Sequence, residues 1–169
     1  MEARAKILGH PIHQMLIPFP FGLLATAVVF EAIYLAWGNP AMATVAYWMI
    51  VAGIIGGLVA APFGLIDYLA IPSGTRAKSV GALHGGGNVV VLLLFAASWW
   101  LRVDDPARPE LLASVLAFAG AVLALGTGWL GGELVDRLSV GVDDGAHLDA
   151  PSSLSGKPAG ARDAGPRAA

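Results

Sequence analysis

The sequence predicts an all-α protein, a bundle of four transmembrane helices whose two termini lie on the same side of the bilayer. Of its 169 residues, 56% are hydrophobic and only 13% are charged, whereas charged residues make up roughly 25% of a soluble domain. Four apolar stretches also exceed the roughly 20 residues that are needed to cross a hydrocarbon core about 30 Å thick. Lipid is therefore the expected partner of most of the surface.

The four helices are expected at approximately residues 15–37, 42–71, 79–101 and 109–135. The first follows a short basic start, but a signal-peptide core is only roughly 7 to 15 residues long, so a retained helix is predicted. Helices one and two are separated only by Gly38-Asn39-Pro40, which makes them antiparallel neighbours. Pro72-Ser73-Gly74 and Asp104-Asp105-Pro106 break the chain before helices three and four.

We define the N-terminal side of the membrane as the side that holds the N-terminus, the loop at residues 72–78 and the C-terminus. Five basic residues lie close to it, namely Arg4, Lys6, Arg76, Lys78 and Arg137. Only Arg102 and Arg108 lie on the opposite side, so the positive-inside rule predicts that both termini are cytoplasmic. Interfacial aromatic residues gather at the opposite side, namely Trp37, Tyr47, Trp48, Trp99 and Trp100.

Three segments follow from this layout. Residues 1–14 form a polar N-terminal segment with a His-Pro motif, and residues 15–140 form the four-helix membrane domain. Residues 141–169 are rich in Gly, Ala, Pro, Ser and Asp. So few large apolar side chains cannot offset the entropy cost of ordering, and a disordered cytoplasmic tail is predicted.

Composition also excludes several functional classes. A net charge of −2 without a long basic run argues against nucleic-acid binding. The absence of Cys removes disulfides, thiolate metal sites and iron–sulfur clusters. No nucleophile elbow and no Gly-rich phosphate-binding motif is found, which disfavours a hydrolase. The sequence leaves open whether the protein is an enzyme.

Ionisable residues inside the spans point most directly to function, because each costs roughly 2.5 to 3.5 kcal/mol at the bilayer centre. They are Glu31, Asp67, His84 and, at the edge of helix four, Glu133. Asp67 continues the stripe of small residues Gly53, Gly57, Ala60 and Gly64, so its side chain is expected to face protein. For Glu31 we expect a hydrogen bond between helices.

Helix three carries His84 and Asn88 one turn apart on the same face. Asp67 and His84 both lie roughly 6 to 8 Å inside the N-terminal side, so a hydrogen bond between them is predicted. This bond has two interpretations: a structural link between helices two and three, or a link that leaves the second imidazole nitrogen free for a metal or a proton. Gly85-Gly86-Gly87 predicts a neighbouring helix or a planar cofactor flat against the backbone.

Two separated motifs resemble those of a bacterial membrane family catalogued as "domain of unknown function 2231". They are HPIHQMLIPFPFG at residues 10–22 and GWLGGELV at residues 128–135, the second followed by Gly141-Val142. The resemblance covers about residues 9–142 and implies a four-helix fold in the bacterial inner membrane. It also implies polar positions that match Glu31, Asp67, His84 and Asn88. Gln14 stands where the family often has Pro, and Glu31 where it often has Asp.

Three functional hypotheses follow. In the first, the bundle binds haem b or a divalent metal for electron transfer, with His84 and either His10 or His13 as axial ligands beside Asn88. A non-haem variant uses His84, Asp67 and Glu133. The second hypothesis is a proton or small-solute pathway through Asp67, His84 and Glu31. The third is a structural subunit, in a homo-oligomer or a larger membrane complex, that packs through the Gly-rich faces of helices two and four.

Overall fold

The structure is a computed structural model and describes residues 1–162 of the chain. It is helical through the membrane domain, with four spans that are long and apolar enough to cross a bilayer. The spans are formed by α1 (Ile12–Leu16) with α2 (Pro18–Trp37), α3 (Pro40–Ala70), α4 (Arg76–Trp100), and α5 (Leu111–Gly132) with the π-helix η1 (Glu133–Arg137). The predicted all-α, four-span fold is confirmed.

Local sequence explains the helix boundaries. Gly38 ends α2 in the left-handed conformation, at φ +67°, and the Asn39 side chain then caps α3 by accepting a hydrogen bond from the Ala41 N–H at 3.1 Å. The Thr75 hydroxyl likewise accepts from the Lys78 N–H at 3.1 Å. Because this cap lies before the apolar run, α4 begins three residues earlier than the predicted start at Ser79.

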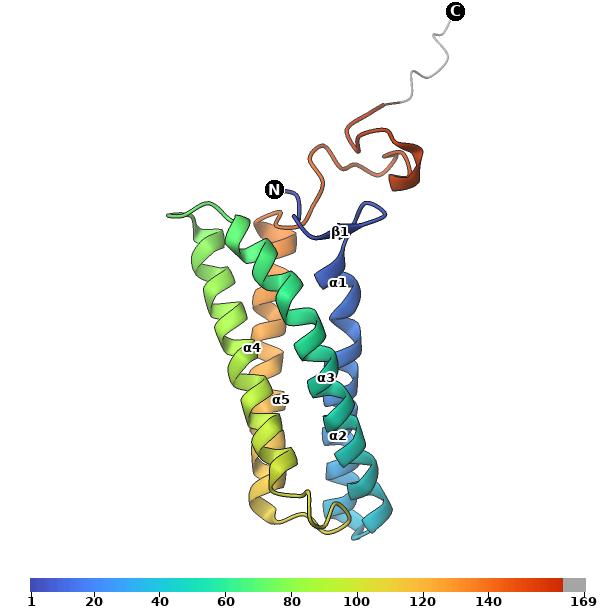
Figure 1. The fold of residues 1–169 in the computed structure, drawn as a ribbon, viewed down its shortest axis with the longest axis vertical. Coiled ribbons are helices and arrows are strands. Elements are labelled where there is room, and N and C mark those ends of the chain that lie inside the picture. The colour runs from blue at the N-terminus through green and yellow to red at the C-terminus, as the bar shows by residue number, and fades with distance from the viewer. Residues whose placement is uncertain (163–169) are drawn as a thin grey trace, which may run out of the picture.

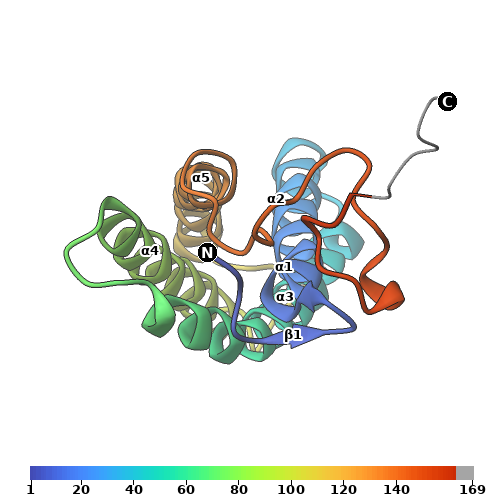
Figure 2. The same cartoon turned by 90° about the horizontal axis from the view of Figure 1, so that it is seen from above.

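The helices associate as two pairs. α2 packs along α3, and α4 packs along α5, with the two pairs side by side (Figures 1 and 2). Their shared core is formed by Leu24, Ala27, Ile50, Val91, Phe95 and Ala117, all of them buried. Large apolar side chains on the outer surface, such as Leu58, Leu93 and Val122, are exposed. This reversal of the soluble pattern is what a bilayer solvent requires.

A small β-hairpin, which the sequence reading did not predict, precedes the bundle. Strand β1 (Lys6–Ile7) pairs antiparallel with β2 (His10–Pro11). The two turn residues, Leu8 and Gly9, have φ values of +51° and +86°, as a two-residue hairpin turn of type I′ demands. The Ile12 N–H donates to the Ala5 carbonyl at 2.9 Å, which joins the hairpin directly to the start of α1.

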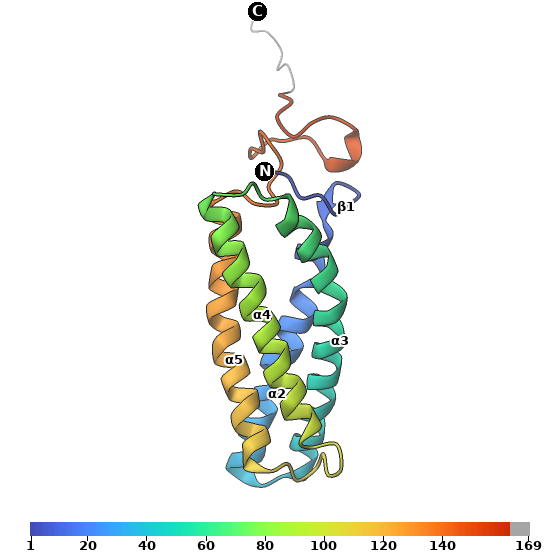
Figure 3. The same ribbon diagram turned by 60° about the vertical axis from the view of Figure 1, so that its left-hand side comes forward.

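The C-terminal segment lies at the same end of the bundle as the N-terminus, as Figures 1 and 3 show. Its described part, up to residue 162, contains turns and one short 3-10 helix, η2 (Ser153–Ser155). It contacts the N-terminal segment through Lys6 and Asp143 at 2.5 Å and through the Ser153 hydroxyl and His10 at 3.3 Å. The rest of the predicted disordered tail, residues 163–169, lies outside the described residues.

Candidate functional site

Two polar clusters occupy opposite ends of the bundle, and the first is a buried ion pair on the side opposite the termini. Arg102 and Glu31 are 0% and 1% exposed, and the Arg102 Nη1 donates to Glu31 Oε2 at 2.8 Å. Arg102 also donates to the Ser98 hydroxyl at 3.0 Å, while the Ser114 hydroxyl donates to the other Glu31 oxygen. We call these four residues the ion-pair network.

The ion-pair network joins the two helix pairs. Glu31 comes from α2, Ser98 and Arg102 come from α4 and the turn after it, and Ser114 comes from α5. Among the described residues, no buried side-chain nitrogen or oxygen lacks a hydrogen-bond partner. Each polar side-chain atom of this buried pair already has a partner within the protein, and the bonds join α2 to α4 and α5, which is the arrangement of a structural clamp.

The second cluster, which we call the histidine site, contains His13 of α1 and His84 of α4. His13 Nδ1 lies 3.0 Å from the Ala60 carbonyl oxygen, and His84 Nδ1 lies 2.8 Å from the Thr127 carbonyl oxygen. A carbonyl oxygen can only accept, so each Nδ1 carries the hydrogen and donates it. In the neutral rings the lone pair therefore resides on Nε2. The two ring centroids are 6.5 Å apart, with the planes at 87°.

Asn88 completes the histidine site on α4. The Thr127 hydroxyl donates to Asn88 Oδ1 at 3.0 Å, and Asn88 Nδ2 donates to the His84 carbonyl at 2.9 Å. The same amide nitrogen lies 3.3 Å from His84 Nε2, a long contact. His13 Nε2 has no hydrogen-bond partner among the described residues. The Nε2 lone pair of His84 thus has only a weak partner and that of His13 has none among the described residues. In the ion-pair network, in contrast, every buried polar atom has a hydrogen-bond partner.

Glycines form the surfaces against which both imidazoles pack. A Cβ at Gly64 would come within 2.7 Å of His13 Cε1, and one at Gly131 within 3.1 Å of His84 Cε1. Gly87 similarly makes room for the Thr127 methyl group, which a Cβ would approach to 2.5 Å. These three glycines are therefore explained by the histidine site and its support.

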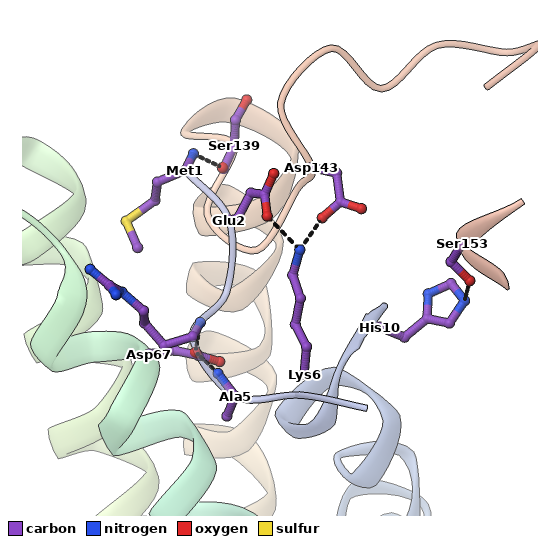
Figure 4. A network of polar contacts seen from close by, with 10 residues as sticks. Met1, Glu2, Ala5, Lys6, His10, Asp67, Ser139, Asp143 and Ser153 are labelled. Carbon is purple, nitrogen blue, oxygen red and sulfur yellow. Dashed lines mark hydrogen bonds and ion pairs between the residues drawn. The ribbon is translucent and has the colours of Figure 1, made fainter. Parts of the chain in front are cut away.

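The remaining residues of the predicted site lie elsewhere. Asp67 accepts from the backbone N–H groups of Arg4 and Ala5, at 2.6 and 3.0 Å, and not from His84, so the predicted Asp67–His84 hydrogen bond is wrong. A similar depth on two helices does not determine which way a side chain points around its helix. Asp67 lies beside residues 4–5, just before the N-terminal hairpin (Figure 4).

The predicted non-haem ligand set is also separated. Glu133 forms an ion pair with Arg76 at 2.5 Å, which leaves His84 without either predicted carboxylate. Within residues 1–162, no group of three or more His, Asp or Glu side chains is placed to hold a metal ion. His10 is exposed on β2 and lines a cavity of ≈ 360 Å³ outside the bundle, between the hairpin and the C-terminal segment.

The glycine run beside His84 is only partly explained by the chain itself. Gly87 packs on Thr127, but Gly85 and Gly86 are exposed and have nothing within 4 Å of an added Cβ. Among the described residues, no helix of the chain itself packs flat against all three glycines. On α3, in contrast, Gly53 and Gly57 make room for Leu24 and Leu92 of the same chain.

Sequence reasoning missed several participants. Arg102 was counted only as a basic residue of the opposite side, although a carboxylate within reach at similar depth was a usable signal. Thr127 contributes mainly through its backbone carbonyl, which residue type does not reveal. The same holds for Ala60, whose carbonyl accepts from His13.

Comparison with known proteins gives one match. A family model described as "Predicted membrane protein (DUF2231)" matches residues 9–144, most of the chain. Neither the curated proteins nor the solved structures contain a match. The match spans both polar clusters and the start of the C-terminal segment.

Proposed function

The chain belongs to the DUF2231 family of predicted membrane proteins, and we propose that it is an electron-transfer protein that binds haem b between His13 and His84. The observation that carries the proposal is the pair of imidazoles whose Nδ1–H groups are both committed to backbone carbonyls, at 3.0 and 2.8 Å. Ligating histidines characteristically donate the other ring N–H in this way, because it fixes the tautomer and raises the basicity of Nε2.

The separation of the rings fits a shared metal. Two imidazoles that faced each other across one metal, at roughly 2.0 to 2.1 Å per bond, would have centroids about 6.4 Å apart. The centroids of His13 and His84 are 6.5 Å apart. Two neutral nitrogen donors from facing helices are also the ligand set that a four-helix bundle offers to haem. A non-haem ion would need further ligands, which the described residues do not supply.

The positions of His10 and His13, the two alternatives that the sequence left open, favour His13 as the ligand. His13 lies on α1 inside the bundle, whereas His10 lies on the exposed strand β2 and contacts Ser153. We therefore assign the ligand role to His13 and His84. Asn88 is assigned a supporting role, because its amide links the His84 carbonyl to the Thr127 hydroxyl.

Bound haem would supply a one-electron carrier at the N-terminal side of the membrane. The chain contributes binding and orientation: the Ala60 and Thr127 carbonyls hold the two imidazoles, and Gly64 and Gly131 leave room for them. We propose that this side faces the cytoplasm of a bacterium. Because Arg102 is buried in an ion pair, only Arg108 remains as an exposed cation on the opposite side, and the charge bias is larger than the sequence indicated.

The test is the absorbance spectrum of the detergent-purified protein, before and after haem addition. We expect a Soret band and the sharp visible bands of a six-coordinate, low-spin haem, and His13→Ala and His84→Ala should each abolish that six-coordinate form. His10→Ala is the matched control and should keep the full spectrum. Absence of a Soret band in the wild-type protein, even with added haem, rejects the proposal.

A proton pathway is less well supported by the placement of the polar groups. On α2, Leu24 and Ala27 lie between His13 and Glu31, and on α4 Val91 and Phe95 lie between Asn88 and Ser98. All four separating side chains belong to the buried apolar core. A continuous hydrogen-bonded path between the two polar clusters is therefore not formed by the described residues.

One observation favours a second candidate, the structural or accessory subunit. Gly85 and Gly86 each cost a helix about 1 kcal/mol relative to Ala, and no contact within the described chain explains them. Docking of another helix, from a second copy or a larger complex, would explain both. Native mass spectrometry from mild detergent tests this: the wild type should be oligomeric and Gly86→Leu monomeric, whereas a monomeric wild type rejects it.

A further inference from the structure

We infer that Asp67 is a positioning residue for His13, acting through the N-terminal hairpin and not as a ligand. The inference deepens the proposed function and rests on it for the haem measurement, but the positioning itself can be tested without haem. It assigns a role to a membrane-embedded carboxylate that would otherwise lack a reason to lie at this depth.

The first step is the contact between Asp67 and the hairpin. Asp67 Oδ1 accepts from the Arg4 N–H at 2.6 Å and from the Ala5 N–H at 3.0 Å. Figure 4 shows the carboxylate pointing at this stretch of backbone. Hydrogen bonds to an ionised acceptor are roughly twice as strong as neutral ones, so this contact is a firm attachment of residues 4–5 to α3.

The second step connects Ala5 to His13. The Ala5 carbonyl accepts from the Ile12 N–H at 2.9 Å, and Lys6 pairs with Pro11 in the hairpin. Ile12 is the first residue of α1 and immediately precedes His13. The attachment at Asp67 therefore reaches the ligand helix through one backbone hydrogen bond and a hairpin of fixed register.

The third step is that α1 needs such an attachment. It has only five residues, no side-chain N-cap and no buried residue, and Pro18 follows closely. α1 continues into α2 through Ile17, whose backbone is helical and whose N–H donates to the His13 carbonyl at 3.1 Å, so it forms the first turns of one span. Its uncapped N-terminal end is held against α3 by Asp67 through residues 4–5, and by Ala60 and Gly64 through His13.

These α3 residues form one face. Ala60, Gly64 and Asp67 follow at intervals of four and three residues, so they lie along a single line on the helix. One face of α3 thus holds the imidazole at two points and the segment that leads to it at a third. In this arrangement the Asp67 carboxylate accepts from the backbone of residues 4–5 and makes no hydrogen bond to His84 among the described residues.

The first experiment uses the full chain without haem. Amide hydrogen exchange of residues 1–12 is measured in the wild type, Asp67→Ala and Asp67→Asn, with Asp136→Ala as a matched control. Asp136 is an exposed carboxylate at the same end that makes no hydrogen bond or ion pair among the described residues. We expect at least tenfold faster exchange of residues 4–12 in Asp67→Ala and an unchanged rate in Asp136→Ala. Unchanged exchange in Asp67→Ala overturns the inference.

The second experiment reads out His13 in the haem-loaded protein. We expect Asp67→Ala to shift the haem from six-coordinate to five-coordinate while His84 stays bound. Asp67→Asn keeps a neutral acceptor oxygen and should restore six-coordination and most of the protection, which also covers the case in which the Ala variant does not fold. Loss of His13 ligation in Asp67→Asn while residues 4–12 stay protected overturns the inference. Absence of haem from the wild type would reject the proposed function. The hydrogen-exchange experiment, which needs no haem, would still test whether Asp67 positions His13.

Discussion

The ion-pair network and the histidine site lie at opposite ends of one helical bundle and differ in how completely their polar atoms are paired. At one end, Arg102 and Glu31 are almost completely buried and every buried polar atom has a partner. At the other, His13 and His84 are only partly buried, and their Nε2 atoms keep lone pairs with weak partners or none. The difference shows that a buried polar residue with all its hydrogen-bonding atoms paired indicates a structural role. A polar residue with an unpaired nitrogen or oxygen indicates a binding site.

The largest effect should come from breaking the ion-pair network. Arg102→Ala leaves the Glu31 carboxylate buried without its counter-ion, and loss of one partner of a buried pair costs about 3–5 kcal/mol. Equilibrium unfolding in mixed micelles measures the loss. Arg108→Ala, at an exposed arginine on the same side, is the control and should stay within about 0.5 kcal/mol of the wild type.

If Arg102→Ala is as stable as Arg108→Ala, the network is not a clamp. The double variant Glu31→Leu with Arg102→Met sharpens the result, since an apolar replacement of both partners is often neutral or stabilising. Recovery of stability in the double variant, without recovery in either single variant, would show that the cost comes from the unpaired charge.

Substitution in the histidine site should have a small effect on stability and a large effect on haem binding. His84→Ala loses the hydrogen bond to the Thr127 carbonyl, and a net contribution of about 0.5–1.5 kcal/mol is expected for such a bond. Haem binding should nevertheless disappear. Unfolding and haem titration of the same samples separate the two properties. A stability loss as large as that of Arg102→Ala would remove the distinction between the two ends.

The glycines test the geometry of the histidine site more finely. An added methyl group at Gly64 would lie 2.7 Å from His13, whereas at Gly85 it would meet nothing within 4 Å. Gly64→Ala should therefore displace the imidazole and weaken haem binding at least tenfold. Gly85→Ala should bind haem normally and gain up to about 1 kcal/mol of stability from helix propensity. Equal affinity of the two variants, measured by haem titration, would contradict the assigned ligand position.

The smallest effect is expected for the two surface ion pairs that Lys6 forms with Glu2 and Asp143 at the N-terminal side. The hydrogen bond to Lys6 lowers the pKa of Glu2 below its usual 4.5, and the hydrogen bond to Asp143 raises the pKa of Lys6 above 10.5. The Glu2 contribution is present above pH 4.5 and is lost as the pH falls through the lowered pKa. The Lys6 contribution is present below pH 10.5 and is lost as the pH rises through the raised pKa.

Protection of the C-terminal segment from hydrogen exchange, corrected for the intrinsic pH dependence, should therefore be constant around neutrality and fall at both extremes. Lys6→Ala should remove this pH dependence while leaving the ion-pair network and overall unfolding almost unchanged. A pH-independent protection in the wild type would show that these surface ion pairs hold nothing in place.

Sequence reasoning predicted the fold well because hydrophobic length and helix-breaking residues act locally. The Gly38-Asn39-Pro40 turn and the span ending at Trp37 were both predicted correctly. The site was predicted only as a set of residues, since His84 and Asn88 share a face but their partners come from other helices. The ion pair of Arg102 was not predicted because its side chain folds back into the bundle, and the partners of Asp67 were not predicted because rotation about α3 is set by tertiary contacts.

The central claim, that His13 and His84 hold haem b at the N-terminal side, is tested most directly by electron paramagnetic resonance of the oxidised, haem-loaded protein. Their ring planes lie at 87°, and two imidazoles that held a haem in this relative orientation would give a highly anisotropic low-spin ferric signal, whereas parallel rings would give a rhombic one. We predict the anisotropic signal in the wild type and in Arg108→Ala, and its loss in His13→Ala. A protein that takes up no haem, or one whose low-spin signal survives His13→Ala, would contradict the account.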